Sequence, residues 1–149
     1  MGPRRGGGNG PGGVEVEWRP MSRWGHQAGR DGLGIVDYTL AKRAQLRDFR
    51  SGLLSRPDIC DAHPELLRAA RYLGAEASHP CPVCRRYELR LLAYVFADGL
   101  KGNNGRAFEV EKGLAVAARH RGGACYVVEV CTWCSWNHLS EAFRARHAG

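Results

Sequence analysis

Two Cys-x-x-Cys pairs constrain this chain of 149 residues more than any other feature. Cys81 and Cys84 form the first pair, and Cys131 and Cys134 form the second. Zinc prefers four tetrahedral ligands, and a tight turn lets two such cysteines bind one ion from the same side. Residues 85–130 separate the pairs, an interval longer than the roughly 15–20 residues of common zinc sites. A loop and a helix inserted between two strands would account for that length, so the sequence predicts one structural Zn²⁺.

Three other chemistries use paired cysteines. Disulfides belong to oxidising compartments, and the N-terminus lacks the apolar segment of a secretory signal. A thioredoxin-like redox pair needs one exposed motif in a βαβ context, and it would leave the second pair unexplained. An iron–sulfur cluster also accepts four cysteines, but paired turns beside strands favour zinc. A four-thiolate zinc site has no open position for water, so its role would be in folding.

Hydrophobic periodicity and breaker residues predict an α+β fold. Ile35–Leu54 has its apolar residues on one helical face, and Pro64–Leu73 has an apolar stripe that Gly74 ends. We expect these two helices to pack as an N-terminal helical hairpin over residues 35–74.

In the C-terminal half, apolar residues recur at every second position in two segments, as in β-strands. Strands are predicted at Glu88–Phe96 and Ala124–Cys131, with a short helix at Phe108–Arg119 between them and a last short helix capped by Asn137. Residues 75–149 would therefore form a zinc-ribbon-like element packed on the hairpin, and 35–149 would be one compact domain. The glycine-rich residues 1–34 offer little apolar surface, so they are expected to form a disordered tail that folding does not need.

The basic charge of the chain lies mostly in its body. The formal net charge is +7, and residues 1–34 carry five arginines against three acids. The remaining residues therefore carry +5, which suits a polyanionic partner but also an ordinary basic protein. The candidate nucleic-acid contacts are a helical row, two arginines beside the first cysteine pair, and a tryptophan able to stack on a base: Arg43, Arg47, Arg50, Arg85, Arg86 and Trp133. A solvated helix face, and tryptophans that shield the metal, are the competing interpretations.

The remaining cysteines and histidines are expected to have structural roles rather than to bind metal or take part in catalysis. Cys60 and His63 have Cys-x-x-His spacing, but two further ligands are missing, so a buried thiol and a helix-cap histidine are expected. Cys125 should pack as a small hydrophobe in its strand. His138 follows the second pair and is either a hydrogen-bonding neighbour of the metal site or a surface residue. The chain has no catalytic motif of the serine-hydrolase, phosphate-loop or His-Glu-x-x-His type, so no enzyme and no small-molecule substrate are expected.

Four runs of residues together resemble a known family: Val36–Arg43, Cys60–Arg71, Cys81–Arg85 and Val128–Leu139. They are similar to a small, zinc-ribbon-like actinobacterial family catalogued as a domain of unknown function. The resemblance covers residues 35–143 and leaves out the glycine-rich tail. It implies an actinobacterial, cytoplasmic protein, and it supplies no activity.

These observations lead to one main functional hypothesis and two alternatives. The main hypothesis is a non-enzymatic zinc module that docks on a nucleic-acid-handling machine of transcription or translation, such as a ribonucleoprotein or polymerase-type assembly. The first alternative is a protein–protein adaptor without nucleic-acid contact, and the second is a thiol–zinc redox sensor. No apolar run approaches the roughly 20 residues that span a bilayer, so a membrane partner is not expected.

Overall fold

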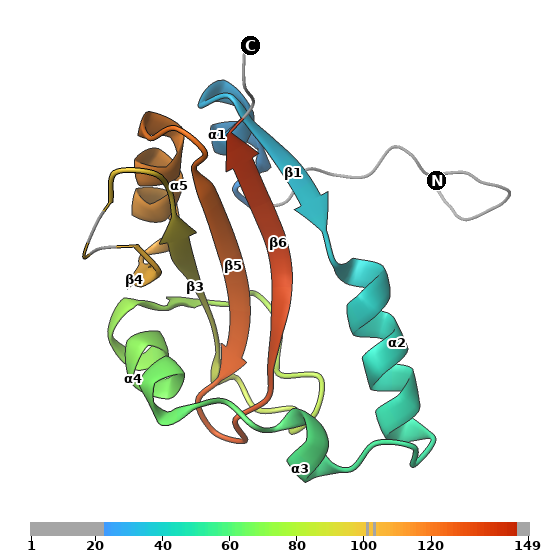
Figure 1. Cartoon of the computed structure of the whole chain (residues 1–149). Helices are drawn as coiled ribbons and strands as arrows, with labels where there is room; N and C mark the ends of the chain where they lie inside the picture. The colour runs from blue at the N-terminus through green and yellow to red at the C-terminus, as the bar shows by residue number, and fades with distance from the viewer. Residues whose placement is uncertain (1–22, 101, 103, 146–149) are drawn as a thin grey trace, which may run out of the picture.

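One antiparallel sheet organises the protein, with helices packed around it (Figure 1). The computed structural model describes residues 23–100, 102 and 104–145, and predictions about residues 1–22 lie outside them. Within the described part, six strands pair in the order β1-β6-β5-β3-β2, and β4 also pairs with β3. The strands are β1 (Leu33–Asp37), β2 (Ala75–Glu76), β3 (Leu89–Phe96), β4 (Arg106–Phe108), β5 (Ala124–Cys131) and β6 (Asn137–Ala145). The helices are α1 (Gly25–Arg30), α2 (Thr39–Arg50), α3 (Arg56–Ile59), α4 (Pro64–Leu73) and α5 (Val110–Arg119).

The α+β prediction is confirmed, together with four of its elements: β3, β5, α4 and α5. Helix α4 begins where the sequence indicated, because Pro64 occupies its first turn and the His63 ring accepts a hydrogen bond from the Glu65 backbone N–H at 3.1 Å. Gly113, expected only to weaken α5, allows close packing: a Cβ there would lie 3.0 Å from the Cβ of Ala93. Strands β3 and β5 belong to the larger sheet rather than to a separate ribbon.

Two predicted helices are wrong in whole or in part. The C-terminal short helix does not form, and the segment is strand β6, which pairs with β5 on one side and β1 on the other. The predicted helix Ile35–Leu54 begins only at Thr39, because Ile35 and its neighbours pair with β6 as strand β1. In both segments the hydrogen bonds of the sheet prevail over an apolar spacing that suits a helix.

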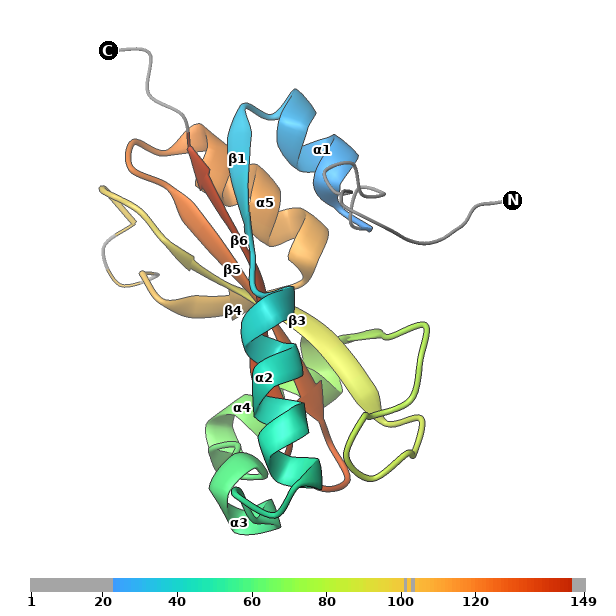
Figure 2. The same cartoon turned by 90° about the vertical axis from the view of Figure 1, so that its right-hand side faces the viewer.

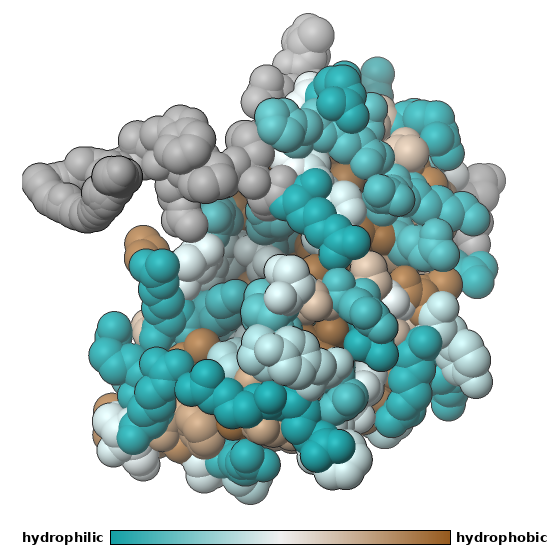
Figure 3. Space-filling view, turned by 180° about the vertical axis from the view of Figure 1, so that it is seen from behind, coloured by the Kyte–Doolittle hydropathy of each residue, from teal (hydrophilic) through white to brown (hydrophobic). Residues whose placement is uncertain are grey.

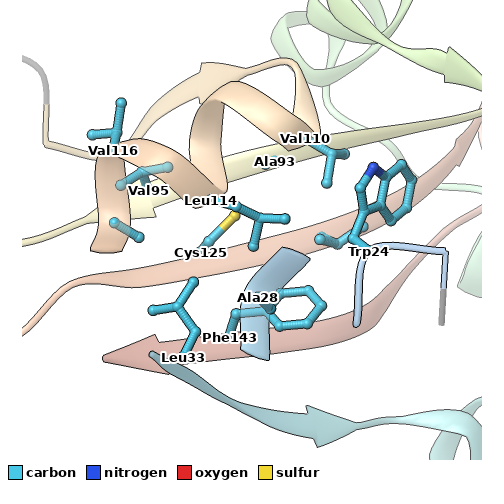
Figure 4. Packing of buried hydrophobic residues seen from close by; sticks show 12 residues of the cluster. Trp24, Ala28, Leu33, Ala93, Val95, Val110, Leu114, Val116, Cys125 and Phe143 are labelled. Carbon is cyan, nitrogen blue, oxygen red and sulfur yellow. The ribbon is translucent and has the colours of Figure 1, made fainter. Parts of the chain in front are cut away.

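The expected tail boundary at residue 34 is also wrong. Helix α1 lies within the predicted tail, and Trp24, Ala28 and Leu33 are buried in the core that α5 forms with the sheet (Figure 4). Two polar contacts anchor the helix: the Arg23 guanidinium donates to the Glu76 carbonyl at 3.1 Å, and the Gln27 amide donates to the Glu111 carbonyl at 3.2 Å. These few apolar residues pack because the sheet and α5 already provide a partner surface.

The helical hairpin of residues 35–74 is not formed, since α2 and α4 pack in different clusters. Ala70 of α4 packs with Leu92 and Val130, whereas Leu46 of α2 packs with Leu89 and Trp136. Neighbouring residues on a strand point to opposite faces. Leu92 therefore faces α4, while Ala93, its neighbour, faces α5, and the helices cover both faces of the sheet (Figure 2).

The described surface is mixed in character. Seen from behind, hydrophobic residues form separate patches between hydrophilic ones rather than one continuous face (Figure 3). None of the helices in the described ranges is long and apolar enough to cross a membrane.

Candidate metal centre

The four cysteines of the two pairs meet at one end of β3 and β5. The first pair lies in the segment that leads into β3, and the second lies at the end of β5 and in the turn to β6. Leu89 is the register partner of Cys131, so the antiparallel pairing brings the two segments together. All four Sγ atoms lie within 4.8 Å of one another, and this cluster could hold a metal ion.

Two of the sulfur separations are close to the edge of a tetrahedral site. Cys84 and Cys131 are 3.6 Å apart at Sγ, and Cys81 and Cys134 are 3.7 Å apart. A zinc–sulfur distance of about 2.3 Å gives a regular tetrahedron an edge of about 3.8 Å. A disulfide would require about 2.05 Å, and these cysteines are free thiols.

The two cysteine turns share one backbone geometry. In each turn the N–H of the residue after the second cysteine donates to the carbonyl of the first: Arg85 to Cys81 at 2.9 Å, and Ser135 to Cys131 at 3.0 Å. The N–H of the first cysteine donates to the carbonyl five residues on, at 2.9 Å and 2.8 Å. Arg85 and Ser135 both have positive φ, 69° and 74°. This conformation is uncommon for residues other than glycine, so its occurrence in both turns shows that the two turns are structurally equivalent.

The electrostatics of the cluster favour a cation. Burial raises the pKa of Cys81 to about 11, and burial also raises the pKa of Cys134. Burial acts the same way on Cys84, but hydrogen bonds from the Arg86 backbone and the neighbouring thiols lower its pKa overall. Burial therefore opposes ionisation of Cys81 and Cys134 unless a positive charge lies beside them. A divalent ion supplies that charge and deprotonates coordinating thiols.

A small apolar core supports the centre. Cys81 and Cys131 are buried with Leu89, Trp136 and Ile59 in one cluster. The Trp136 indole N–H donates to the Gln45 side chain at 3.0 Å, which fixes the ring. Trp136 is thus packed beside the cysteines, whereas Trp133 is 61% exposed. His138 stacks on Trp136 with ring centroids 6.3 Å apart, and so touches the site through that ring.

Cys60, expected as a buried thiol, is only half-buried, and its position beside the cysteine cluster was missed by sequence reasoning. It follows α3, and its thiol donates to Cys134 with the sulfurs 3.8 Å apart. Burial raises the pKa of Cys60, which favours the protonated donor form. His63 caps α4, so the Cys-x-x-His spacing does not form a second metal site. Cys125, as expected, is buried as a small hydrophobe in the other core.

The predicted basic residues separate into two groups. Arg86 lies over the ring of Trp133, with its guanidinium carbon 3.8 Å from the ring centroid, and its Nε donates to Glu88 at 3.1 Å. Arg85 is exposed in the same turn as Cys81. The row of Arg43, Arg47 and Arg50 is exposed along α2.

A buried ion pair was also missed by sequence reasoning. The Glu129 carboxylate is 5% exposed and lies 2.9 Å from the Lys42 ammonium and 3.7 Å from the His79 ring. The pair ties α2 to β5 beside the metal cluster. A single glutamate in a predicted strand gives no sequence signal for it.

Comparison with known proteins places the chain in a family. The model of the family of unknown function DUF5318 matches residues 30–148. Uncharacterized proteins Mb0050 of Mycobacterium bovis and Rv0049 of Mycobacterium tuberculosis are each 41% identical over 108 residues, which span 72% of this chain and 79% of each relative. No solved structure gives a significant match. The predicted resemblance is therefore confirmed, and the chain belongs to the DUF5318 family of unknown function.

Proposed function

We propose that the four-cysteine cluster holds one structural Zn²⁺ and that the protein is a non-enzymatic zinc module. The observation that carries the proposal is the repeated turn geometry around four sulfurs that all lie within 4.8 Å of one another. Four thiolates complete the coordination of zinc, so the ion would link the segment before β3 to the β5–β6 turn and resemble a zinc ribbon within the larger sheet. Free thiols suit the reducing cytoplasm, which is the proposed location.

We further propose that the cysteine turns present a nucleic-acid-binding surface. Trp133 lies between the second pair of cysteines, and Tyr87 beyond the first pair is 72% exposed. Arg85 and Arg86 lie beside them, and the Arg86–Trp133 contact holds a cation and an aromatic face together. Aromatic faces stack on unpaired bases and guanidinium groups bind phosphate, so the surface suits RNA or DNA within a transcription or translation assembly.

A protein–protein adaptor is the second candidate, and one observation favours it. Strand β1 is an edge strand, and Ile35 and Val36 on it are exposed together with Leu40 at the start of α2. Exposed apolar residues on the outermost strand of the described sheet offer a surface for another protein.

Zinc content and nucleic-acid binding test the proposal together. Purified protein should contain one zinc per chain by native mass spectrometry, and Cys84→Ser should lose it. Zinc-loaded wild type should bind single-stranded RNA or DNA more tightly at low salt than at high salt, because phosphate contacts release counterions. The double variant Arg85→Gln/Arg86→Gln should keep its zinc and reduce the slope of log K against log salt by roughly one unit per lost contact, somewhat less on single strands.

Two sets of variants distinguish nucleic-acid binding at a specific site from binding that depends only on the net positive charge. The triple variant Arg43→Gln/Arg47→Gln/Arg50→Gln tests the α2 row, and Arg119→Gln/Arg121→Gln removes two exposed charges at the opposite end of β5. Equal weakening by the Arg119/Arg121 variant would mean that binding follows net charge alone. Zinc-loaded wild type that binds no nucleic acid at low salt would leave the adaptor as the better candidate. A folded wild type that contains no metal would contradict the zinc site.

A further inference from the structure

Cys60 provides a fifth sulfur beside the proposed metal site. Its Sγ lies 3.8 Å from the Sγ of Cys134, as close as the cysteines of the cluster lie to one another. Cys60 is outside the set of four sulfurs that lie within mutual ligand distance. Its thiol is therefore free to react while the other four hold a metal.

The segments that carry the two cysteines are held together by hydrogen bonds. The Ala62 N–H donates to the Ser135 carbonyl at 3.0 Å, and the Asn137 side-chain amide donates to the Asp61 carboxylate at 3.0 Å. Ile59, the residue before Cys60, is buried in the core around the metal site. The short distance between Cys60 and Cys134 is thus held by contacts on both sides of Cys60 and by contacts of the residues that follow Cys134.

We propose that Cys60 and Cys134 form a redox pair, in which a hydroperoxide converts the two residues into a disulfide and the metal is released. The inference rests on the proposed zinc site and extends it to regulation. Cys134 is half-buried, whereas Cys81 and Cys131 are buried, so a small oxidant reaches Cys134 more easily than it reaches those two. Loss of Cys134 removes one of the four ligands and frees the turn that carries Trp133.

The chemistry balances with hydrogen peroxide as the oxidant. The Cys134 thiolate attacks one peroxide oxygen, the O–O bond breaks, and sulfenic acid and hydroxide form as the zinc–sulfur bond is lost. The Cys60 sulfur then attacks the Cys134 sulfur, so an S–S bond forms and the S–O bond breaks. The thiol proton of Cys60 leaves with the departing hydroxyl as water, and a solvent proton converts the hydroxide into a second water. The two sulfurs lose two electrons in total, and the peroxide gains them.

Zinc release under peroxide tests the proposal. Wild type, Cys60→Ser and Cys125→Ala are loaded with zinc, their metal content is measured, and hydrogen peroxide is added with a chromogenic zinc chelator present. Wild type should release its zinc, lose the mass of two hydrogen atoms, and give a linked Cys60–Cys134 peptide on digestion. A thiol reductant with added zinc should restore the metal-bound form. Cys60→Ser should bind zinc normally and release it about tenfold more slowly, because no neighbouring thiol traps the sulfenic acid.

Cys125→Ala is the matched control, because Cys125 is a buried thiol in the other core. It should release zinc at the wild-type rate and form the same linked peptide. Release from Cys60→Ser at the wild-type rate, or a disulfide that maps to other cysteines, would overturn the redox pair and leave the zinc site intact. Absence of zinc from all three proteins before oxidation would instead contradict the proposed function itself.

Discussion

Ser135 shows how single residues shape the two cysteine turns. Its φ of 74° is a left-handed conformation, and its N–H closes the turn on the Cys131 carbonyl at 3.0 Å. Left-handed backbone costs roughly 1–2 kcal/mol for a residue with a Cβ, and more for a β-branched one. Neither Ser135 nor Arg85 suggests positive φ from its residue type, so this strain could not be predicted from the sequence.

We expect Ser135→Gly to leave the stability within about 1 kcal/mol of wild type or to raise it, since glycine adopts positive φ at low cost. Ser135→Val should lower the free energy of unfolding by about 1–3 kcal/mol, because a branched Cβ crowds the left-handed backbone. Urea unfolding of the zinc-loaded proteins measures both. Ser78→Val is the matched control and should change stability little, because Ser78 is exposed and is not among the described residues with positive φ. Equal effects of valine at both positions would argue against strain in the turn.

The four cysteines could be predicted from the sequence because two ligands in each turn are set by local spacing. The two cysteine pairs come together because strands β3 and β5 pair with each other. The alternation of apolar residues in Leu89–Phe96 and Ala124–Cys131 predicted both strands correctly. Cys60 could not be placed, because its position beside Cys134 depends on the path of α3 and on hydrogen bonds between distant segments.

At the scale of elements, the sequence pattern predicted correctly those helices and strands whose formation depends on residues close together in the chain. Helix α4 has its proline start, its apolar stripe and its glycine end in one continuous stretch. Strand β6 lacks such a local signal. Ala142 and Phe143 are adjacent and both are buried, so the strand is covered on both faces and its apolar residues do not alternate with polar ones there. A register irregularity between Val127 and Val128 of β5 disturbs the alternation further. The spacing of its apolar residues therefore suggests a helix, and only the pairing with β1 and β5 shows that the segment is a strand.

Removal of helix α1 should lower the stability of the protein. A chain that starts at Ile35 loses Trp24, Ala28 and Leu33 from the core, and truncation of a buried tryptophan to alanine alone costs about 3–5 kcal/mol. We therefore expect this truncated protein to melt many degrees below the full-length chain, and Trp24→Ala to show much of the same loss. Thermal unfolding followed by circular dichroism measures the difference.

A chain that starts at Arg23 is the control for this truncation. It retains every described element, and the prediction that residues 1–22 are dispensable for folding is tested by its melting temperature. An Ile35 truncation as stable as the full-length protein would mean that α1 and the first residues of β1 contribute nothing to the core.

The described residues form a small core beneath α4 and two larger cores, one at each end of the long strands. One core contains Trp24, Leu114 and Phe143, and no cysteine of the candidate metal site belongs to it. The other contains Cys81, Cys131 and Trp136, and it packs directly against the remaining cysteines of the cluster. The first core contains none of the four cysteines, whereas beside the second core the segment before β3 and the β5–β6 turn meet at the cysteine cluster.

Metal removal should therefore loosen one end of the molecule and spare the other. After treatment with a chelator, amide hydrogen exchange in residues 81–86 and 131–137 should rise by about tenfold or more, because the proposed ion no longer holds the two turns together. Amides of α5 and of β1, which pack in the first core, should keep their protection. Cys84→Ser should reproduce the pattern without chelator. Uniform loss of protection would show that the ion supports the whole fold, and unchanged exchange at the turns would show that it supports none of it.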